Sequence, residues 1–358
     1  MNLSITAPTR IDLAGGTLDV YPLYLFEGGG LTLNAAIDVP VHVTMQARDD
    51  GQLHIASHDI GAREQHASLA TMELGGELDL IKRTLHFYRP PCGLNVSTVS
   101  QAPRGSGLGS SSALLMALSC GLNEICHLGL DRERMIDLGA NIEAQTVGVP
   151  TGKQDYFPPM FGGVRAIWFD VEGFHHQDLS EGNDLIDRLN QRLILSFTNI
   201  SRFSGLTNWA MLKRYVEREG DTVERIRRIK GVAMAMQESL VRLDLDSFAD
   251  LLRLEWENRR GLAEGVTSPE IDSMISAAED AGARASKLCG AGGGGCMITY
   301  AEPQDRAAVK RSLTKAGATL MDFGIVRDAM TTSASAGDRR HSHRHGEPPH
   351  KRLRNTAR

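Results

Sequence analysis

The sequence predicts an α+β protein of two domains. Its 358 residues are more than one ordinary domain usually holds. Alternating apolar and polar residues, which are typical of strands, dominate the first half, whereas the second half is mostly helical and regains strands only near its end. This order favours α+β over an alternating parallel sheet. We expect domains at 1–187 and 188–332.

Strand-like segments and three helices alternate along the predicted first domain. The strand pattern appears at 3–8, 11–15, 31–37, 39–47, 51–57, 93–103 and 165–170. Helices are expected at 78–88, which stops before a Pro-Pro pair, and then at 112–128 and 133–148. The loop between residue 103 and the second of these helices is rich in glycine and serine.

The predicted second domain opens with a strand at 192–198 and continues with helices. Apolar residues spaced by three and four predict a mostly helical stretch over 209–261 and a helix over 268–282. A glycine-rich segment then precedes a strand at 296–301, a helix over 305–317 and a last strand at 318–326.

The formal net charge of −5 is unevenly distributed. Residues 333–358 contain seven Lys and Arg against two Asp and Glu, so the rest of the chain carries about −10. An acidic body argues against nucleic acid as the main partner. The basic, His-rich tail has almost no apolar residues, so we expect it to be disordered.

Cysteine usage and hydropathy predict a cytoplasmic protein. The five cysteines include no Cys-x-x-Cys pair and are interpreted as reduced thiols. The N-terminus lacks the charged and apolar regions of a signal peptide, and no segment has the length of a membrane span. We therefore expect no membrane partner.

The loop PRGSGLGSSSA, residues 103–113, has the features of an anion site. A strand, a glycine-rich turn and a helix entered through serines would bring free backbone N–H groups and the positive end of the helix to one point. Glycines let the backbone approach a phosphate closely. The loop lacks the Lys of a Walker motif. By itself it fits equally well an ordinary Gly/Ser loop in which Ser110 caps the helix.

Three other segments carry groups suited to chemistry. Arg10 and Asp19 lie on either side of a glycine turn, which could place a fixed cation and a carboxylate for hydroxyl binding. Residues 287–300 contain GAGGGG before a strand, a run that is costly unless a ligand or another backbone comes near. Of Glu143 and Asp155, one carboxylate could bind a metal ion while the other accepts the proton of a substrate hydroxyl. Each segment alone also fits a surface turn, a loose hairpin loop or a solvated helix face.

Together, these segments resemble the GHMP kinase superfamily. The matching motifs are APTRIDLAGG-x-x-D, then P-x-x-x-GLGSSSA, then GKQD, then K-x-x-GAGGGGC, in this order between residue 7 and about residue 300. The resemblance implies an N-terminal domain like the second domain of ribosomal protein S5 and a ferredoxin-like C-terminal domain. It also implies ATP-dependent phosphorylation of a small-molecule hydroxyl, with Mg²⁺, by a monomer or homodimer.

The resemblance assigns roles to residues motif by motif. Ser111 and Glu143 would bind Mg²⁺, Asp155 would be the catalytic base, and Arg10 would orient it or stabilise the transferring group. The implied ATP contacts are Pro103, Gly105, Ser106, Gly107, Leu108, Gly109, Ser110 and Ser111. The implied acceptor contacts are Asp19, Gly16, Thr17, Gly292 and Gly293.

Within the superfamily the chain is similar to the sugar kinase branch of heptose 7-phosphate kinases and fucokinases. The LAGG-x-x-D and GKQD motifs carry this similarity, although Leu18 separates Thr17 from Asp19 and the residues after Asp155 differ from that branch's pattern. We expect a sugar or sugar phosphate as acceptor. A mevalonate-type or homoserine-type kinase of the same superfamily, or a non-catalytic nucleotide-binding or sugar-binding relative, is the alternative.

Overall fold

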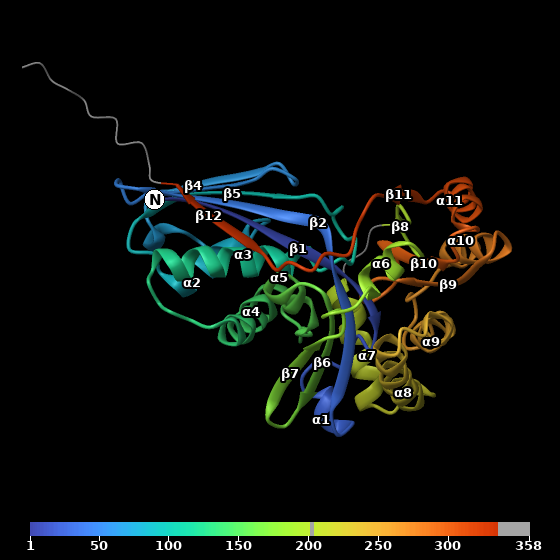
Figure 1. Ribbon diagram of the computed structural model, residues 1–358. Coiled ribbons are helices and arrows are strands. Elements are labelled where there is room, and N and C mark those ends of the chain that lie inside the picture. Colours follow the sequence, from blue (N-terminus) through green and yellow to red (C-terminus); the bar gives the residue numbers. More distant parts are fainter. Residues whose placement is uncertain (201–203, 336–358) are drawn as a thin grey trace, which may run out of the picture.

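The computed structural model describes residues 1–200 and 204–335. Two sheets lie side by side, with helices packed around them (Figure 1). The first sheet has the strand order β12-β1-β2-β5-β3-β4, and β6 pairs with β2 and β7. Its strands are β1 (Asn2–Ala14), β2 (Gly30–Arg48), β3 (Leu53–Ser57), β4 (Ala62–His66), β5 (Gly93–Ser100), β6 (Val164–Asp170), β7 (Gly173–Asp178) and β12 (Thr331–Ser335).

Two long strands form the spine of the first sheet. β2 pairs with β6 over its first residues and with β5 over its last ones, and β1 runs antiparallel beside it. From Ala7 onward β1 is buried on both faces. This strand therefore carries the charged residues Arg10 and Asp12 into the interior of the molecule.

Helices cover one face of the first sheet. α3 packs on β1 and β2, and α2 and α4 pack on α3. Small residues such as Ala113 and Ala117 are fully buried in the cluster that α3 forms with these strands, which lets the helix approach the sheet closely. The elements of this half are α1 (Leu23–Phe26), η1 (Leu69–Thr71), α2 (Asp79–Tyr88), α3 (Ser110–Ile125), α4 (Arg132–Val147), η2 (Gln154–Tyr156) and α5 (Phe157–Phe161).

The second sheet is antiparallel and has the order β11-β8-β10-β9. Its strands are β8 (Leu193–Phe197), β9 (Ala283–Leu288), β10 (Cys296–Ala301) and β11 (Thr319–Met321). The helices of this half are α6 (Leu185–Asn190), α7 (Ser204–Val216), α8 (Thr222–Val241), α9 (Leu245–Arg259), α10 (Pro269–Asp280) and α11 (Arg306–Lys315). α9 packs on β9, and α10 packs on α11.

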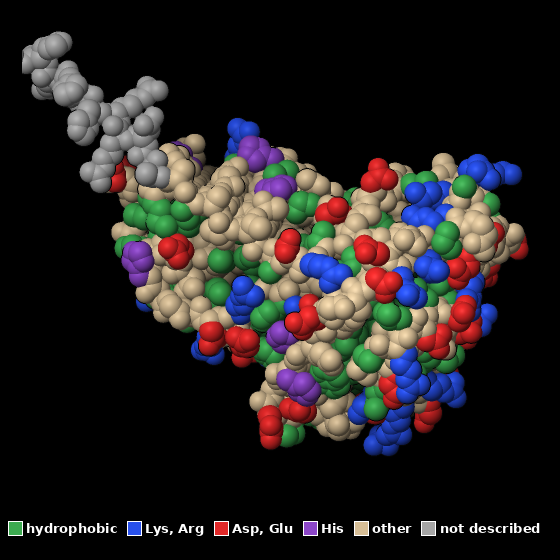
Figure 2. All heavy atoms as spheres, viewed as in Figure 1, with side chains coloured by type: hydrophobic (Ala, Val, Ile, Leu, Met, Phe, Trp, Pro, Cys, Tyr) green, Lys and Arg blue, Asp and Glu red, His purple; other side chains and the backbone are tan. Residues whose placement is uncertain are grey.

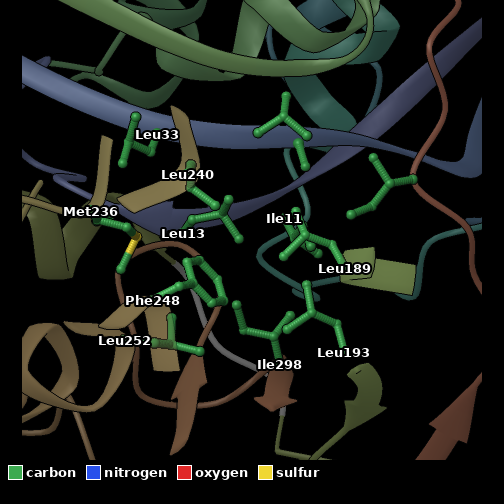
Figure 3. Close-up of a cluster of buried hydrophobic side chains, with 14 of the residues drawn as sticks. Ile11, Leu13, Leu33, Leu189, Leu193, Met236, Leu240, Phe248, Leu252 and Ile298 are labelled. Carbon is green, nitrogen blue, oxygen red and sulfur yellow. The ribbon is translucent and has the colours of Figure 1, made fainter. Parts of the chain in front are cut away.

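One apolar core joins the two sheets. Figure 3 shows Leu13 and Leu33 of the first sheet close to Leu240 of α8 and Phe248 of α9, with Ile298 of β10 nearby. Each of these five side chains is fully buried. Because the core is continuous between the sheets, groups contributed by both halves of the chain are held in fixed relative positions.

The α+β prediction is confirmed, and the structure revises several details of it. The strands predicted at 3–8 and 11–15 form the single strand β1, and α3 begins at Ser110 rather than at residue 112. The sequence places residues up to 332 in the second domain. β12 instead pairs with β1, so the chain returns to the first sheet after β11.

The predicted disordered tail, 333–358, falls mostly outside the described residues, which end at residue 335; Ser333–Ser335 belong to β12. In the part of the chain that is described, none of the helices is long and apolar enough to cross a membrane.

Candidate active site

A cleft of about 750 Å³ is lined by residues from both halves of the chain. Part of its wall is apolar and comes from the region of β5 and α2; it includes Val41, Ile60, Leu78, Ile81 and Val99. Another part is polar and is formed by Arg10, Thr17, Asp19, Gln154, Asp155, Asn208 and Arg259. The glycine-rich loop before α3 also lines the cleft.

The loop before α3 has the conformation of an anion cradle. Gly105, Gly107 and Gly109 all have φ values near +71°, a region that side chains other than glycine rarely adopt. Gly109 caps α3, so Ser110 and Ser111 lie in the first turn, where backbone N–H groups have no partner within the helix. The loop and the helix end thus present donors to a bound anion.

The second glycine-rich segment packs backbone to backbone against this loop. A Cβ added at Gly107 would lie 2.5 Å from the carbonyl oxygen of Cys289, and one added at Gly295 would lie 2.6 Å from that of Ser106. The N–H of Cys296 also donates to the Ser106 carbonyl at 2.6 Å. Close approach of two backbones therefore explains why both segments need glycine.

Arg10 links the loop before α3 to Asp155; this loop, residues 103–109, is called the phosphate loop after its predicted ligand. Its guanidinium donates to both carboxylate oxygens of Asp155, each at 2.7 Å, and to the carbonyl of Gly107. Its backbone N–H donates to the Leu108 carbonyl at 2.9 Å. Although burial opposes the charge, the carboxylates of Asp155 and Asp12 raise the pKa of Arg10 above its ordinary value. Asp155 is thus held in one orientation by a permanent cation.

Glu143 is held by three hydroxyl groups. Ser111 donates to its Oε1 at 2.6 Å, Ser112 donates to its Oε2 at 3.1 Å, and the buried Tyr156 also donates to Oε2. Burial raises the pKa of Glu143, and the hydrogen bonds from Ser111 and Tyr156 oppose this rise. Ser112, which the sequence suggests only starts the helix, therefore helps to orient this carboxylate.

Asp19 lies buried in the polar part of the cleft. The backbone N–H of Gln154 donates to its Oδ2 at 3.0 Å, and a Cβ at Gly152 would lie 2.0 Å from the same oxygen. Burial raises the pKa of Asp19 to about 6; the Gln154 N–H opposes this and the nearby Asp155 charge adds to it. The side-chain oxygen of Gln154 is buried without a partner among the described residues.

Four buried charged residues support the polar part of the cleft, which Arg259 itself lines, and sequence analysis identified none of them as site residues. Lys287 donates to Asp12 at 2.9 Å, and Arg259 donates to Glu255 at 2.8 and 2.5 Å. All four side chains are at most 1% exposed. The i,i+4 spacing of Glu255 and Arg259 was the only local signal, because Asp12 and Lys287 are 275 residues apart.

The structure brings most of the predicted site residues to the cleft. Its walls include Arg10, Gly16, Thr17, Asp19, Gly105, Ser106, Gly107, Gly109, Ser110, Ser111, Glu143 and Asp155. Pro103 and Leu108 support the loop through backbone carbonyls that accept from Ser106 and Arg10, instead of lining the cleft.

Two of the three glycines predicted to contact the acceptor, Gly292 and Gly293, lie away from the cleft, whereas Gly16 lines it. Gly293 donates to the Val266 carbonyl at 2.6 Å, and a Cβ at Gly292 would lie 2.6 Å from the Val266 side chain. Neither lines the cleft, whereas the preceding Gly290 and Ala291 do. The second glycine-rich segment turns away from the cleft after Gly290 and Ala291, because it passes between Val266 and the phosphate loop.

The oxygen donors at the start of α3 fit a magnesium ion. Mg²⁺ in phosphate-transferring sites is usually bound by one or two protein oxygens together with phosphate and water. Ser111 and Glu143 both line the cleft and supply such oxygens. Among the described residues no group of three or more His, Cys, Asp and Glu could hold a metal by itself. An ion held by these two residues would complete its coordination with phosphate and water oxygens.

The visible surface shows no continuous basic stripe. In Figure 2, Lys and Arg side chains alternate with Asp and Glu on the face formed by α8 to α11. A mixed surface of this kind does not resemble the basic footprint of a nucleic-acid-binding protein.

Comparison with known families matches the two halves of the site separately. The GHMP kinases N terminal domain model matches residues 78–163, which include the phosphate loop, Glu143 and Asp155. The GHMP kinases C terminal model matches residues 236–319, which include Arg259 and the second glycine-rich segment.

Curated relatives and solved structures cover nearly the whole chain. D-glycero-alpha-D-manno-heptose 7-phosphate kinase of Campylobacter jejuni is 29% identical over 90% of this chain and 96% of its own length. Mevalonate kinase of Thermococcus onnurineus is 28% identical over 90% and 95%. The structure of a D-glycero-D-manno-heptose 1-phosphate kinase from Bacteroides thetaiotaomicron superposes with a TM-score of 0.76 at 27% identity, covering 93% of this chain and 99% of that one.

Proposed function

This chain belongs to the GHMP kinase superfamily, and on that premise we propose that it transfers the γ-phosphoryl group of ATP to a hydroxyl of a sugar phosphate. The observation that carries the proposal is the convergence of Arg10, Asp155 and the phosphate loop in one cleft. The sugar phosphate is inferred from relatives named as heptose 7-phosphate and heptose 1-phosphate kinases.

The phosphate loop and Arg10 would stabilise the transferring group. Phosphoryl transfer through a loose transition state asks mainly for positioning and charge stabilisation. The loop offers N–H groups at the start of α3, and the buried hydroxyl of Ser106 lines the cleft without a partner in the described chain. Mg²⁺, held by Glu143 and Ser111, would neutralise charge on the phosphates.

Asp155 would accept the proton of the attacking hydroxyl. Its two bonds from Arg10 occupy one lone pair on each oxygen, and a carboxylate has further acceptor positions. The side chain is 26% exposed towards the cleft that it lines, so an acceptor can reach it. Arg10 would thus fix the direction in which Asp155 receives the proton.

The polar part of the cleft suits a polyhydroxylated acceptor. Asp19, Thr17 and Asn208 line it, and Gln154 offers an oxygen that lacks a partner among the described residues. A sugar can donate to several such groups, whereas mevalonate presents a methyl group, a carboxylate that donates no hydrogen bond, and only one hydroxyl besides the reacting one. Unsatisfied buried polar groups cost free energy, so this lining favours a sugar over mevalonate.

The test is ADP release measured with a panel of acceptors. The panel contains heptose and hexose phosphates, the free sugars, mevalonate and homoserine, each with Mg²⁺ and ATP. We expect the highest kcat/KM with a sugar phosphate, and a kcat at least about a hundredfold lower for Asp155→Asn despite ATP affinity close to that of the wild type. The exposed Asp49→Asn is the matched control.

Two outcomes would overturn the proposal. Saturable ATP binding without turnover of any acceptor would indicate a non-catalytic relative. A preference for mevalonate or homoserine would keep the reaction class and replace the acceptor.

A further inference from the structure

The four buried charged residues hold two segments at the polar part of the cleft. These segments are the turn of residues 15–19 and the start of the second glycine-rich segment. We call Asp12, Glu255, Arg259 and Lys287 the buried quartet. They come from β1, α9 and β9, so the quartet joins the first sheet to elements of the second half. Asp12 accepts the N–H of Gly290 at 3.0 Å, at the start of the second glycine-rich segment.

Arg259 fixes the turn that carries Asp19. Its Nη2 donates to the carbonyl of Gly16 at 2.8 Å, and its Nη1 lies 3.4 Å from the hydroxyl of Thr17. A Cβ at Gly16 would lie 3.3 Å from Arg259 Nη2 and 3.1 Å from Asp12 Oδ2, so the turn rests directly on the quartet. Thr17 has a φ of +82°, which a threonine adopts only when its surroundings impose it.

Stability alone does not account for the quartet. Its two cations and two anions are balanced, but removing four charges from water costs more than apolar residues of similar size would. One oxygen of Glu255 accepts no hydrogen bond among the described residues, although Lys287 lies 3.5 Å away. The quartet makes hydrogen bonds to Gly16, Thr17 and Gly290, which apolar residues could not make.

We propose that Arg259 is a positioning residue for the acceptor, which holds the turn of residues 15–19 so that Asp19 meets the acceptor hydroxyls. The proposal rests on the kinase function proposed above. Glu255 acts on Arg259 by fixing its guanidinium through two bonds to one oxygen. The hydrogen bonds of Arg259 run to Glu255, Gly16 and Thr17 and not to the phosphate loop, so its loss should affect the acceptor more than the nucleotide.

A pair of variants separates positioning from stability. Arg259→Met alone leaves Glu255 buried without its main partner, so we expect a lower Tm and a raised KM for the acceptor. In the double variant Glu255→Gln with Arg259→Met, the unpaired charge is removed and Tm should return towards the wild type. We expect the acceptor KM of the double variant to stay at least about tenfold raised, the size of one lost charge-assisted hydrogen bond. KM for ATP should remain within about twofold, as this variant leaves the nucleotide contacts in place.

Arg165→Met is the matched control. Arg165 pairs with Asp178 at 3.2 Å in β6 and β7 and does not line the cleft. Its loss should lower Tm without changing the acceptor KM. If the acceptor KM of the double variant recovers together with Tm, Arg259 has only a structural role and the proposal is wrong.

Hydrogen exchange keeps the test independent of the proposed function. In the double variant, the amides of Leu18 and Val20, which bond to Gly15 and Thr17, should exchange faster than in the wild type and in Arg165→Met. If the wild type phosphorylates no acceptor, the proposed function fails while this comparison still decides whether Arg259 holds the turn. Unchanged exchange would overturn the positioning role.

Discussion

Replacing Asp19 with Asn should stabilise the fold at neutral pH while weakening acceptor binding. Asp19 is 2% exposed, and burial raises its pKa from 3.8 to about 6. The folded protein therefore binds this proton more tightly than the unfolded chain does. Between these two pH values the folded state holds more protons, so stability falls as pH rises, and above about pH 6 the loss is complete.

The two pKa values give the size of the effect. The loss of stability due to the Asp19 charge is roughly 1 kcal/mol at pH 4.5 and roughly 3 kcal/mol at pH 7.5. Asn keeps the acceptor oxygen for the Gln154 N–H and carries no charge. Any constant effect of the new amide cancels between the two pH values, so the advantage of Asp19→Asn should grow by about 2 kcal/mol from pH 4.5 to pH 7.5.

Urea unfolding at both pH values measures this difference, with the exposed Asp49→Asn as the control for removing a carboxylate. The acceptor KM of Asp19→Asn should rise at least about tenfold at pH 7.5, because a charged hydrogen-bond acceptor is lost. If the gain in unfolding free energy of Asp19→Asn over the wild type does not change with pH, or is larger at pH 4.5, the link between burial of Asp19 and its pKa is refuted.

Three further substitutions test other parts of the site. Gly107→Ala should abolish ATP binding and lower Tm, because its Cβ would lie 2.5 Å from the Cys289 carbonyl; nucleotide titration and thermal unfolding measure both. Asp155→Asn should reduce kcat by at least about a hundredfold in single-turnover assays while ATP affinity changes little, since the proposed base is lost. Tyr156→Phe removes one hydroxyl from Glu143 and should weaken Mn²⁺ binding with a non-hydrolysable ATP analogue roughly tenfold; unchanged binding by electron paramagnetic resonance would contradict this.

The sequence predicted those parts of the site that local backbone chemistry determines. Glycine at Gly105, Gly107 and Gly109 is required by positive φ within one short loop, and that requirement is visible as a pattern. The helix after the loop was likewise predicted from its apolar residues. The start of α3 was misplaced by two residues, because Gly109 and not a serine caps the helix.

The parts that could not be predicted depend on contacts between distant segments. The quartet forms only because the fold places Asp12 beside Lys287. In the same way, β12 pairs with the edge of β1 that the other strands of the sheet leave open. Gly292 and Gly293 looked equivalent to Gly290 in sequence. The packing of Gly292 and Gly293 against Val266, which the sequence does not reveal, keeps these two glycines away from the cleft.

One short segment of the chain holds in place the groups proposed to bind the acceptor, accept the proton and bind the metal. Gln154 holds Asp19 through its backbone, Asp155 pairs with Arg10, and Tyr156 donates to Glu143. Because these are three consecutive residues of η2, a shift of this turn would displace all three groups together. The Pro-Pro start of α5, immediately after η2, restricts the backbone on one side of the turn.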